Sequence, residues 1–136
     1  MRILALDWGE KTIGCAVGET EGRTAQPLYT ITRRSRSRDL EELRALATRY
    51  RVDLIVVGLP LNMDGSTGPA AEQAQEFARR LEEELDVPTA LQDERLSTVE
   101  AEERLQALGL RPEERAVRRD AVAAAVILED YLALHG

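Results

Sequence analysis

The sequence lacks the residues on which several common kinds of site depend. Its 136 residues include one cysteine, Cys15, and one histidine, His135. No internal disulfide can form, which excludes a secreted disulfide-bonded scaffold. Structural zinc, thiol catalysis and histidine-based catalysis are unsupported for the same reason. We therefore interpret Cys15 as a small core residue.

Long apolar runs are also absent, and aromatic residues make up only 4% of the chain. No segment approaches the ~20 apolar residues of a membrane span. The apolar N-terminus is too short for a signal-peptide core and ends on Asp7. We expect a cytoplasmic protein without membrane contact, folded as one domain over residues 1–136 around a core of aliphatic side chains.

The net charge of −7 is unfavourable for binding a polyanion such as nucleic acid. The basic residues are nevertheless clustered, in two groups: Arg33, Arg34, Arg36 and Arg38, and Arg111, Arg115, Arg118 and Arg119. Such clusters are as typical of a solvated surface as of a nucleic-acid-binding one. Charge alone leaves both interpretations open.

Hydrophobic periodicity predicts an α/β protein. Strands are expected at 2–8, 12–19, 24–33, 53–59 and 87–92, and helices at 39–51, 70–85, 97–109 and 117–134. In the second strand Gly14, Ala16 and Gly18 alternate with bulkier residues, so one of its faces is very small. Ser97 and Glu100 fit a capping box at a helix start. Three meandering strands followed by α/β alternation predict a mixed five-stranded sheet with helices on both faces.

Carboxylates at three places along the chain are candidates for catalytic or metal-binding residues. Asp7 ends a buried strand, a costly position unless the charge is paired or binds a metal, although a turn that caps Gly9 would also explain it. Asp120 lies in line with a buried helical stripe, although interaction with the helix dipole is an alternative. Asp93 and Glu94 end the fifth strand, where only one of them can face Asp7 and where an acidic helix start is the simpler explanation.

Carboxylates from these three places could converge on one or two divalent cations. Oxygen ligands without histidine or cysteine favour Mg²⁺ or Mn²⁺. A glycine-bearing loop at 58–69 precedes a helix, where Ser66, Thr67 and backbone N–H groups could hold a phosphate. The loop lacks the lysine of a nucleotide-binding P-loop, and without other support a flexible loop would explain it equally well.

Four blocks together resemble the YqgF family of nucleases, also called RuvX. They are LALDWGEKTIGCAVG at 4–18, VVGLPLNMDGSTGPAA at 56–71, DERLST at 93–98 and DAVAAAVILEDYL at 120–132. The resemblance covers nearly the whole chain and implies an RNase H-like fold. Members are described as Holliday junction resolvases and as nucleases that mature the 5′ end of pre-16S rRNA. The chain departs from the family at Thr12, where arginine is common, and at Cys15, where valine is usual.

The resemblance implies a metal-dependent phosphodiesterase with the acidic triad Asp7, Glu94 and Asp120. Related RuvC-type resolvases have an acidic residue at the end of the fourth strand, whereas here none occurs before Asp64, so Asp64 and Asp93 remain alternatives to Glu94. On this hypothesis the triad holds two Mg²⁺ ions about 3.5–4 Å apart. Substrate contacts are expected from Lys11, Asp64, Ser66, Thr67, Arg95, Ser97, Thr98, Arg118 and Arg119.

Two other functions compete with this hypothesis. A non-catalytic nucleic-acid or ribosome-associated binding module could keep the same fold. An actin-like sugar or acetate kinase would share the first block, but 136 residues leave no room for its second nucleotide-gripping domain. The residues do not distinguish RNA from branched DNA as substrate. A two-fold-symmetric junction would suit a homodimer, whereas trimming an rRNA end needs no symmetry.

Overall fold

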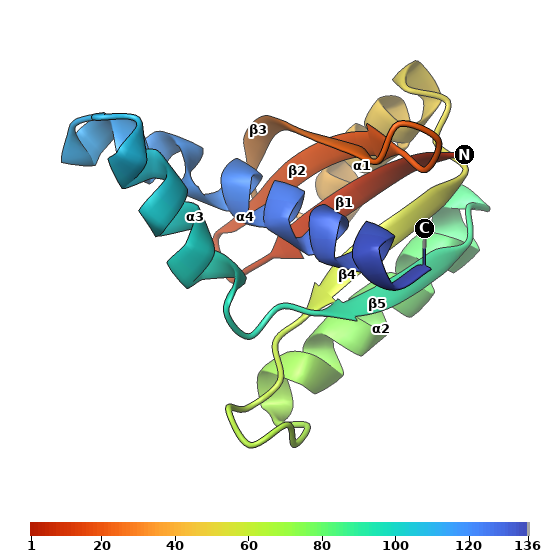
Figure 1. The fold of residues 1–136 in the computed structure, drawn as a ribbon. Coiled ribbons are helices and arrows are strands. Elements are labelled where there is room, and N and C mark those ends of the chain that lie inside the picture. The colour runs from red at the N-terminus through yellow and green to blue at the C-terminus, as the bar shows by residue number, and fades with distance from the viewer. Residues whose placement is uncertain (136) are drawn as a thin grey trace.

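The computed structural model describes residues 1–135 and has the predicted order of strands and helices (Figure 1). The strands are β1 (Arg2–Trp8), β2 (Thr12–Glu19), β3 (Thr24–Thr32), β4 (Leu54–Leu59) and β5 (Thr89–Asp93). The helices are α1 (Arg36–Arg49), α2 (Pro69–Leu85), α3 (Ser97–Ala107) and α4 (Pro112–His135). The five strands form one sheet in the order β3-β2-β1-β4-β5. β1 runs antiparallel to β2 and parallel to β4, which confirms the predicted mixed sheet.

The two faces of the sheet are covered by different helices. Leu4 and Leu6 of β1 pack with residues of α1 and α2, whereas Ile3 and Ala5 pack with α4. Figure 1 shows α4 crossing the front of the sheet, with α1 and α2 behind it. Because side chains alternate along a strand, Asp7 belongs to the α4 face and Trp8 to the face of α1 and α2.

The small face of β2 exists because α4 approaches it closely. A Cβ atom at residue 14 would overlap the backbone carbonyl of Asp120. One at residue 18 would overlap the Thr24 carbonyl of β3 and would also lie 2.9 Å from Leu128 Cδ2 of α4. Between these glycines, Ala16 packs against Ala124 and Ala125 of α4. The small residues that alternate along β2 therefore form the surface against which α4 packs.

Two helices begin earlier than periodicity predicts, and α4 is the more consequential. It begins at Pro112 rather than at the predicted residue 117, so Asp120 lies further inside the helix than expected. Proline and acidic residues at 112–114 are ordinary start signals, but the first turns extend beyond the sheet and carry no apolar stripe. Similarly, α1 begins at Arg36, after Ser35 accepts a hydrogen bond from the Arg38 N–H at 3.2 Å.

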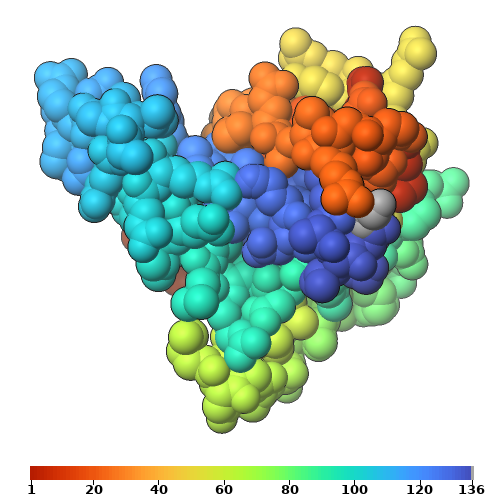
Figure 2. Space-filling view, in the orientation of Figure 1, coloured from red at the N-terminus to blue at the C-terminus, as the bar shows by residue number. Residues whose placement is uncertain are grey.

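The capping box expected at Ser97 is also wrong. Leu96 is the N-cap of α3, and Ser97 is already helical. The Ser97 hydroxyl instead donates a 2.9 Å hydrogen bond to the backbone carbonyl of Glu94. The fifth strand lies at Thr89–Asp93 rather than at 87–92, so it extends up to the acidic pair. Together, α3 and the first turns of α4 form an arm that stands away from the sheet in Figure 2.

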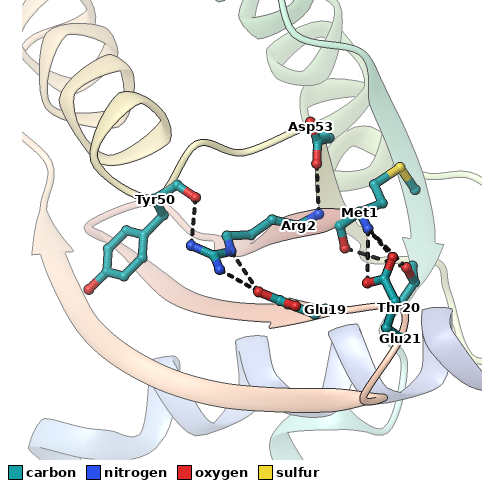
Figure 3. Close-up of polar contacts among 7 residues, drawn as sticks. All are labelled: Met1, Arg2, Glu19, Thr20, Glu21, Tyr50 and Asp53. Atoms are coloured by element: carbon teal, nitrogen blue, oxygen red, sulfur yellow. Dashed lines mark hydrogen bonds and ion pairs between the residues drawn. The ribbon is translucent and has the colours of Figure 1, made fainter.

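Polar contacts tie the sheet together at the end opposite Asp7 (Figure 3). The Arg2 backbone N–H donates to Asp53 at 2.8 Å, and its guanidinium donates to Glu19 and, at 3.2 Å, to the Tyr50 carbonyl. These contacts join the start of β1 to the end of β2 and to the α1–β4 connection. They are at most partly buried, so their contribution to stability is small. No helix within residues 1–135 has the length and apolarity required to cross a bilayer.

The contact between Gly14 and α4 leads to a prediction about stability. We expect Gly14→Ala to lower the free energy of unfolding by about 3 kcal/mol, because the added methyl group overlaps backbone that cannot rotate away. Urea denaturation would measure the change. In the matched variant Gly22→Ala, the new Cβ lies 3.3 Å from the Thr24 side-chain methyl. That methyl can rotate, so equal losses in both variants would contradict the prediction.

Candidate active site

Asp7 lies at the carboxyl end of β1 between two glycines of neighbouring strands. Gly14 of β2 is its antiparallel partner. On the other side Gly58 of β4 follows Val57, the residue paired with Leu6. Residues at the same level of adjacent strands project to the same face. Asp7 therefore points toward α4. Because neither neighbour has a side chain, Asp120 of α4 can approach on the Gly14 side and Glu94 on the Gly58 side.

The carboxyl group of Glu94 fills the space above Gly58. A Cβ atom at residue 58 would lie 2.5 Å from Glu94 Oε2 and 2.8 Å from Ile127 Cδ1 of α4. The backbone N–H of Glu94 donates to the Leu59 carbonyl at 3.2 Å, which ties the end of β5 to the end of β4. Glycine at position 58 is thus a steric requirement for the position of the Glu94 side chain.

Asp7 and Glu94 lie close enough to share a hydrogen bond when one of them is protonated, and they would repel each other if both were ionised. Burial, together with the neighbouring Asp7 carboxylate, raises the pKa of Glu94 to about 9. Burial also raises the pKa of Asp7; a hydrogen bond from Glu94 opposes this shift and the charge of Asp120 adds to it. We interpret the pair as holding one proton between them at neutral pH. Two carboxylates held together in this way are suitable ligands for a hard divalent cation.

Asp120 approaches the pair from α4, but its carboxylate has another partner. Thr12 of β2 donates a hydrogen bond to Asp120 Oδ2 at 2.6 Å. Asp120 lies more than two turns inside α4, beyond the reach of the helix-terminal dipole, so that alternative is removed. Within residues 1–135, no three carboxylate, histidine or cysteine side chains already form a group able to hold a metal. Asp120 would have to turn from Thr12 toward Asp7 to become a third ligand.

The turn after Asp7 does not depend on the Asp7 side chain. The Gly9 N–H donates to the backbone carbonyl of Thr12 at 2.9 Å, so a turn-capping aspartate is not what the structure contains. The other acidic candidates lie elsewhere. Asp93 pairs with Arg95 at 2.8 Å. Asp64, in the exposed loop, accepts a 2.6 Å hydrogen bond from the Ser66 hydroxyl. Of the three alternatives for a second ligand, the structure brings only Glu94 to Asp7.

The predicted substrate contacts fall into two groups. Five of these side chains are exposed near the carboxyl ends of the strands or on α4: Lys11, Ser66, Thr67, Thr98 and Arg118. The other four have partners within the protein, as Ser66 also does through its hydrogen bond to Asp64. Arg95 contacts Asp93 and the Met63 carbonyl, Ser97 is buried against the Glu94 backbone, and Arg119 pairs with Glu102 of α3.

Sequence reasoning missed the roles of two residues, Thr12 and Gly58. Thr12 was notable only as a departure from the family pattern, and nothing in its neighbours indicates that its hydroxyl reaches Asp120. Gly58 offered a usable signal, because a glycine inside an apolar strand often marks the close approach of another group. A glycine at this position in β4 therefore indicates that a side chain from another element lies above the strand.

Comparison with known sequences places the chain in one family. The model of the RuvX family, described as Holliday junction resolvase, matches residues 1–134. A protein of Anaeromyxobacter sp. (strain K), named "Putative pre-16S rRNA nuclease", is 50% identical over 132 residues, which are 97% of this chain and 96% of the relative. A protein of the same name from Halothermothrix orenii is 44% identical over 140 residues, with both chains fully covered.

Solved structures share the fold at low sequence identity. T. thermophilus RuvC in complex with a Holliday junction substrate has a TM-score of 0.61 and 18% identity, over 98% of this chain and 95% of that one. The Fowlpox virus resolvase in complex with Holliday junction DNA also has a TM-score of 0.61, at 12% identity over both complete chains. These similarities confirm the predicted RNase H-like fold.

The carboxyl pair leads to a prediction about pH and stability. The pKa of Glu94 is raised from 4.5 to about 9 in the folded protein, so between these pH values the folded state holds a proton that the unfolded chain has lost. Stability without metal should therefore fall as the pH rises from about 4.5 to about 9. Glu94→Gln should remove this fall and raise the melting temperature at pH 8 by at least about 3 °C. Thermal denaturation in chelator, measured across that pH range, tests both.

Glu103→Gln is the matched control for this experiment. Glu103 is exposed on α3, so the same loss of one charge should leave the pH profile unchanged. If the two variants had identical profiles, repulsion between Asp7 and Glu94 would not limit stability.

The Thr12–Asp120 contact leads to a separate prediction. Thr12→Val keeps the shape of the side chain but removes the donor to a charged acceptor, so it should cost about 1.5 kcal/mol of unfolding free energy in chelator. Thr12→Ser keeps the hydroxyl and should lose less. Urea denaturation of the two variants compares them, and a valine variant as stable as the serine one would show that the hydrogen bond contributes nothing.

Proposed function

Since the chain belongs to the RuvX family, described as Holliday junction resolvase, we propose that it is a divalent-metal-dependent nuclease acting on phosphodiester bonds of structured nucleic acid. The observation that carries this proposal is the Asp7–Glu94 pair at the carboxyl ends of β1 and β5. Two buried acids that share a proton are costly to the fold. A divalent cation that replaced the shared proton would neutralise both carboxylates, which would explain why the fold keeps them together.

Three residues would hold the metal: Asp7, Glu94 and Asp120. Their oxygen donors suit Mg²⁺ or Mn²⁺, in a site for two ions. Such ions, when bound, neutralise charge on the phosphate and make a water molecule more acidic. Asp7 would be positioned by its place at the end of the central strand β1. To hold such ions with Asp7, Glu94 would have to give up its proton, and Asp120 its hydrogen bond from Thr12.

Other residues would bind the nucleic acid rather than the metal. Lys11 is exposed in the turn that follows Asp7, where its ammonium group can approach the scissile phosphate. Arg95, held in place by Asp93, links the end of β5 to the 60–68 loop through the Met63 carbonyl. Contacts to the flanking backbone would come from Ser66, Thr67, Thr98 and Arg118 on nearby exposed surface, with Asp64, Ser97 and Arg119 as supports.

Both substrates named for the family remain part of the proposal. Curated relatives with 44–50% identity carry the name of a pre-16S rRNA nuclease, which favours processing of the rRNA 5′ end. The family description instead names Holliday junctions, whose two-fold symmetry would suit a homodimer. We propose residues 1–136 as one nuclease domain that acts in the cytoplasm. Cleavage assays on both substrates, with mass measured in their presence, separate these activities.

A non-catalytic binding module is the second candidate. The observation in its favour is the hydrogen bond from Thr12, which holds the Asp120 carboxylate on its own partner. Such a module would bind the same nucleic acids without metal-dependent cleavage. The following substitutions distinguish the two candidates.

We expect Asp7→Asn, Glu94→Gln and Asp120→Asn each to lower metal-dependent cleavage at least about 100-fold, because each removes a ligand charge from the site. Initial rates on labelled pre-16S RNA and on a four-way DNA junction provide the measurement. Circular dichroism checks that the fold is kept.

Two further variants make this test specific. Glu103→Gln, outside the site, should cleave at the wild-type rate. Asp93→Asn should lose much less activity than Glu94→Gln, since Asp93 contacts Arg95 rather than Asp7. Cleavage that survives Asp7→Asn, or that needs no divalent ion in the wild type, would refute the proposed nuclease.

A further inference from the structure

A groove lies on the face of the sheet opposite the carboxylates, at the same end of β1. Trp8 follows Asp7 directly and points toward α1 and α2 rather than toward α4. Its ring stacks on Phe77 of α2, with centroids 4.9 Å apart and planes inclined by 16°. The groove that these rings line has a volume of about 640 Å³. This size is typical of sites for small molecules, so a nucleotide fits and a duplex does not.

Arg33 completes a series of three planar groups. Its guanidinium carbon lies 4.6 Å from the centroid of the Trp8 ring. The same side chain donates to the Gly9 carbonyl at 2.7 Å and to the Glu10 carbonyl at 3.2 Å. These bonds keep the guanidinium in place, and Asp39 lies 3.7 Å away as its counter-ion. A base of any identity can stack on an outer member of this fixed series, on Arg33 or on Phe77.

The wall formed by the start of α1 is basic. Arg34 and Arg36 line it, and within residues 1–135 neither side chain has a hydrogen bond or ion pair. The N-terminus of α1 lies at this wall as well, which adds favourable partial charge for an anion.

The opposite wall, on α2, differs in charge. Glu72 and Glu76 line it, but Glu76 is neutralised by Arg79 at 2.6 Å and by Arg80 at 3.0 Å. A phosphate backbone is therefore favoured along the α1 wall, with bases toward the aromatic floor and the α2 wall. One charged wall beside an aromatic floor is the arrangement that single strands require.

We propose that this groove binds the single-stranded part of the nucleic-acid substrate that flanks the scissile phosphate. The proposal rests on the proposed nuclease function, and it adds a second binding site on the other face of the sheet. The two sites lie on opposite faces of the sheet at the same end of β1, where Asp7 and Trp8 are neighbours, and the exposed Lys11 lies in the β1–β2 turn that follows. A strand can cross there from the carboxylates to the groove. Substrates with an unpaired extension would therefore be favoured over fully paired ones.

Trp8 allows the binding to be observed directly, because it is the only tryptophan in the chain. Single-stranded RNA and DNA of about ten nucleotides would be titrated into the Asp7→Asn protein in chelator. We expect both to quench Trp8 fluorescence, whereas a blunt duplex of the same length quenches much less. An acidic peptide that quenches as strongly as the strands would overturn the proposal in favour of a protein partner.

Two double variants, made in the same background, locate the binding site. Arg34→Gln with Arg36→Gln should weaken strand binding about tenfold and reduce the slope of log K against log salt by about 1.4, the value for two lost phosphate contacts on a single strand. Arg23→Gln with Arg51→Gln removes the same charge from exposed positions at the opposite end of the sheet. Binding within twofold of the parent is expected there. Equal losses in both, or no quenching at all, would overturn the groove as a site.

Cleavage assays separate failure of the groove from failure of the nuclease. With Asp7 intact, Arg34→Gln with Arg36→Gln should slow cleavage of a duplex with a single-stranded extension about tenfold and leave a blunt duplex or closed junction unaffected. If wild-type cleavage occurs and the two substrates respond alike, the groove proposal fails and the nuclease stands. If strands quench Trp8 but no substrate is cut, the nuclease fails and the groove remains.

Discussion

The burial of Asp7 and Glu94 side by side is the constraint around which this end of the molecule is organised. The pair is tolerated because each carboxyl group is held by strands that are themselves firmly paired. β1 lies at the centre of the sheet, and the backbone of Glu94 is tied to the end of β4. Holding the two acids together thus lowers the free energy of unfolding. A cation bound as in the proposed function would offset that cost, so affinity for metal and instability without it would have one origin.

Steric requirements extend from this pair to three strands and a helix. Gly58 makes room for the Glu94 carboxyl group, and Gly14 lets the backbone of Asp120 touch β2. The same close approach of α4 places Thr12 within 2.6 Å of the Asp120 carboxylate. A side chain at either glycine would therefore disturb the site through packing, before any ligand was involved. The small face of β2 and the acidic cluster are parts of one arrangement.

Much of the fold could be predicted from the sequence, because strand alternation and helical periodicity are local signals. All nine elements occur in the predicted order, and Asp7 lies at the predicted strand end. The errors arose where local signals and tertiary contacts differ. The first turns of α4 lack an apolar stripe since they extend past the sheet, and Ser97 bonds to the backbone of Glu94 instead of capping α3. The second ligand among Asp64, Asp93 and Glu94 is the one whose side chain crosses above β4. Spacing along the chain does not show which of them does so.

The arm formed by α3 and the first turns of α4 is held differently from the rest of the molecule. α3 packs chiefly on α4, through Ala101 and Leu105, and ion pairs join Arg119 to Glu102 and Arg104 to Glu129. Its first residue, Ser97, is bonded to the backbone of Glu94. With so small an apolar contact, α3 is the helix whose local opening costs least, and added salt would ease it further. Opening of α3 would displace the backbone of Glu94 and leave Asp7 on β1 in place. The rate of amide exchange along α3 would therefore report how often Glu94 moves away from Asp7.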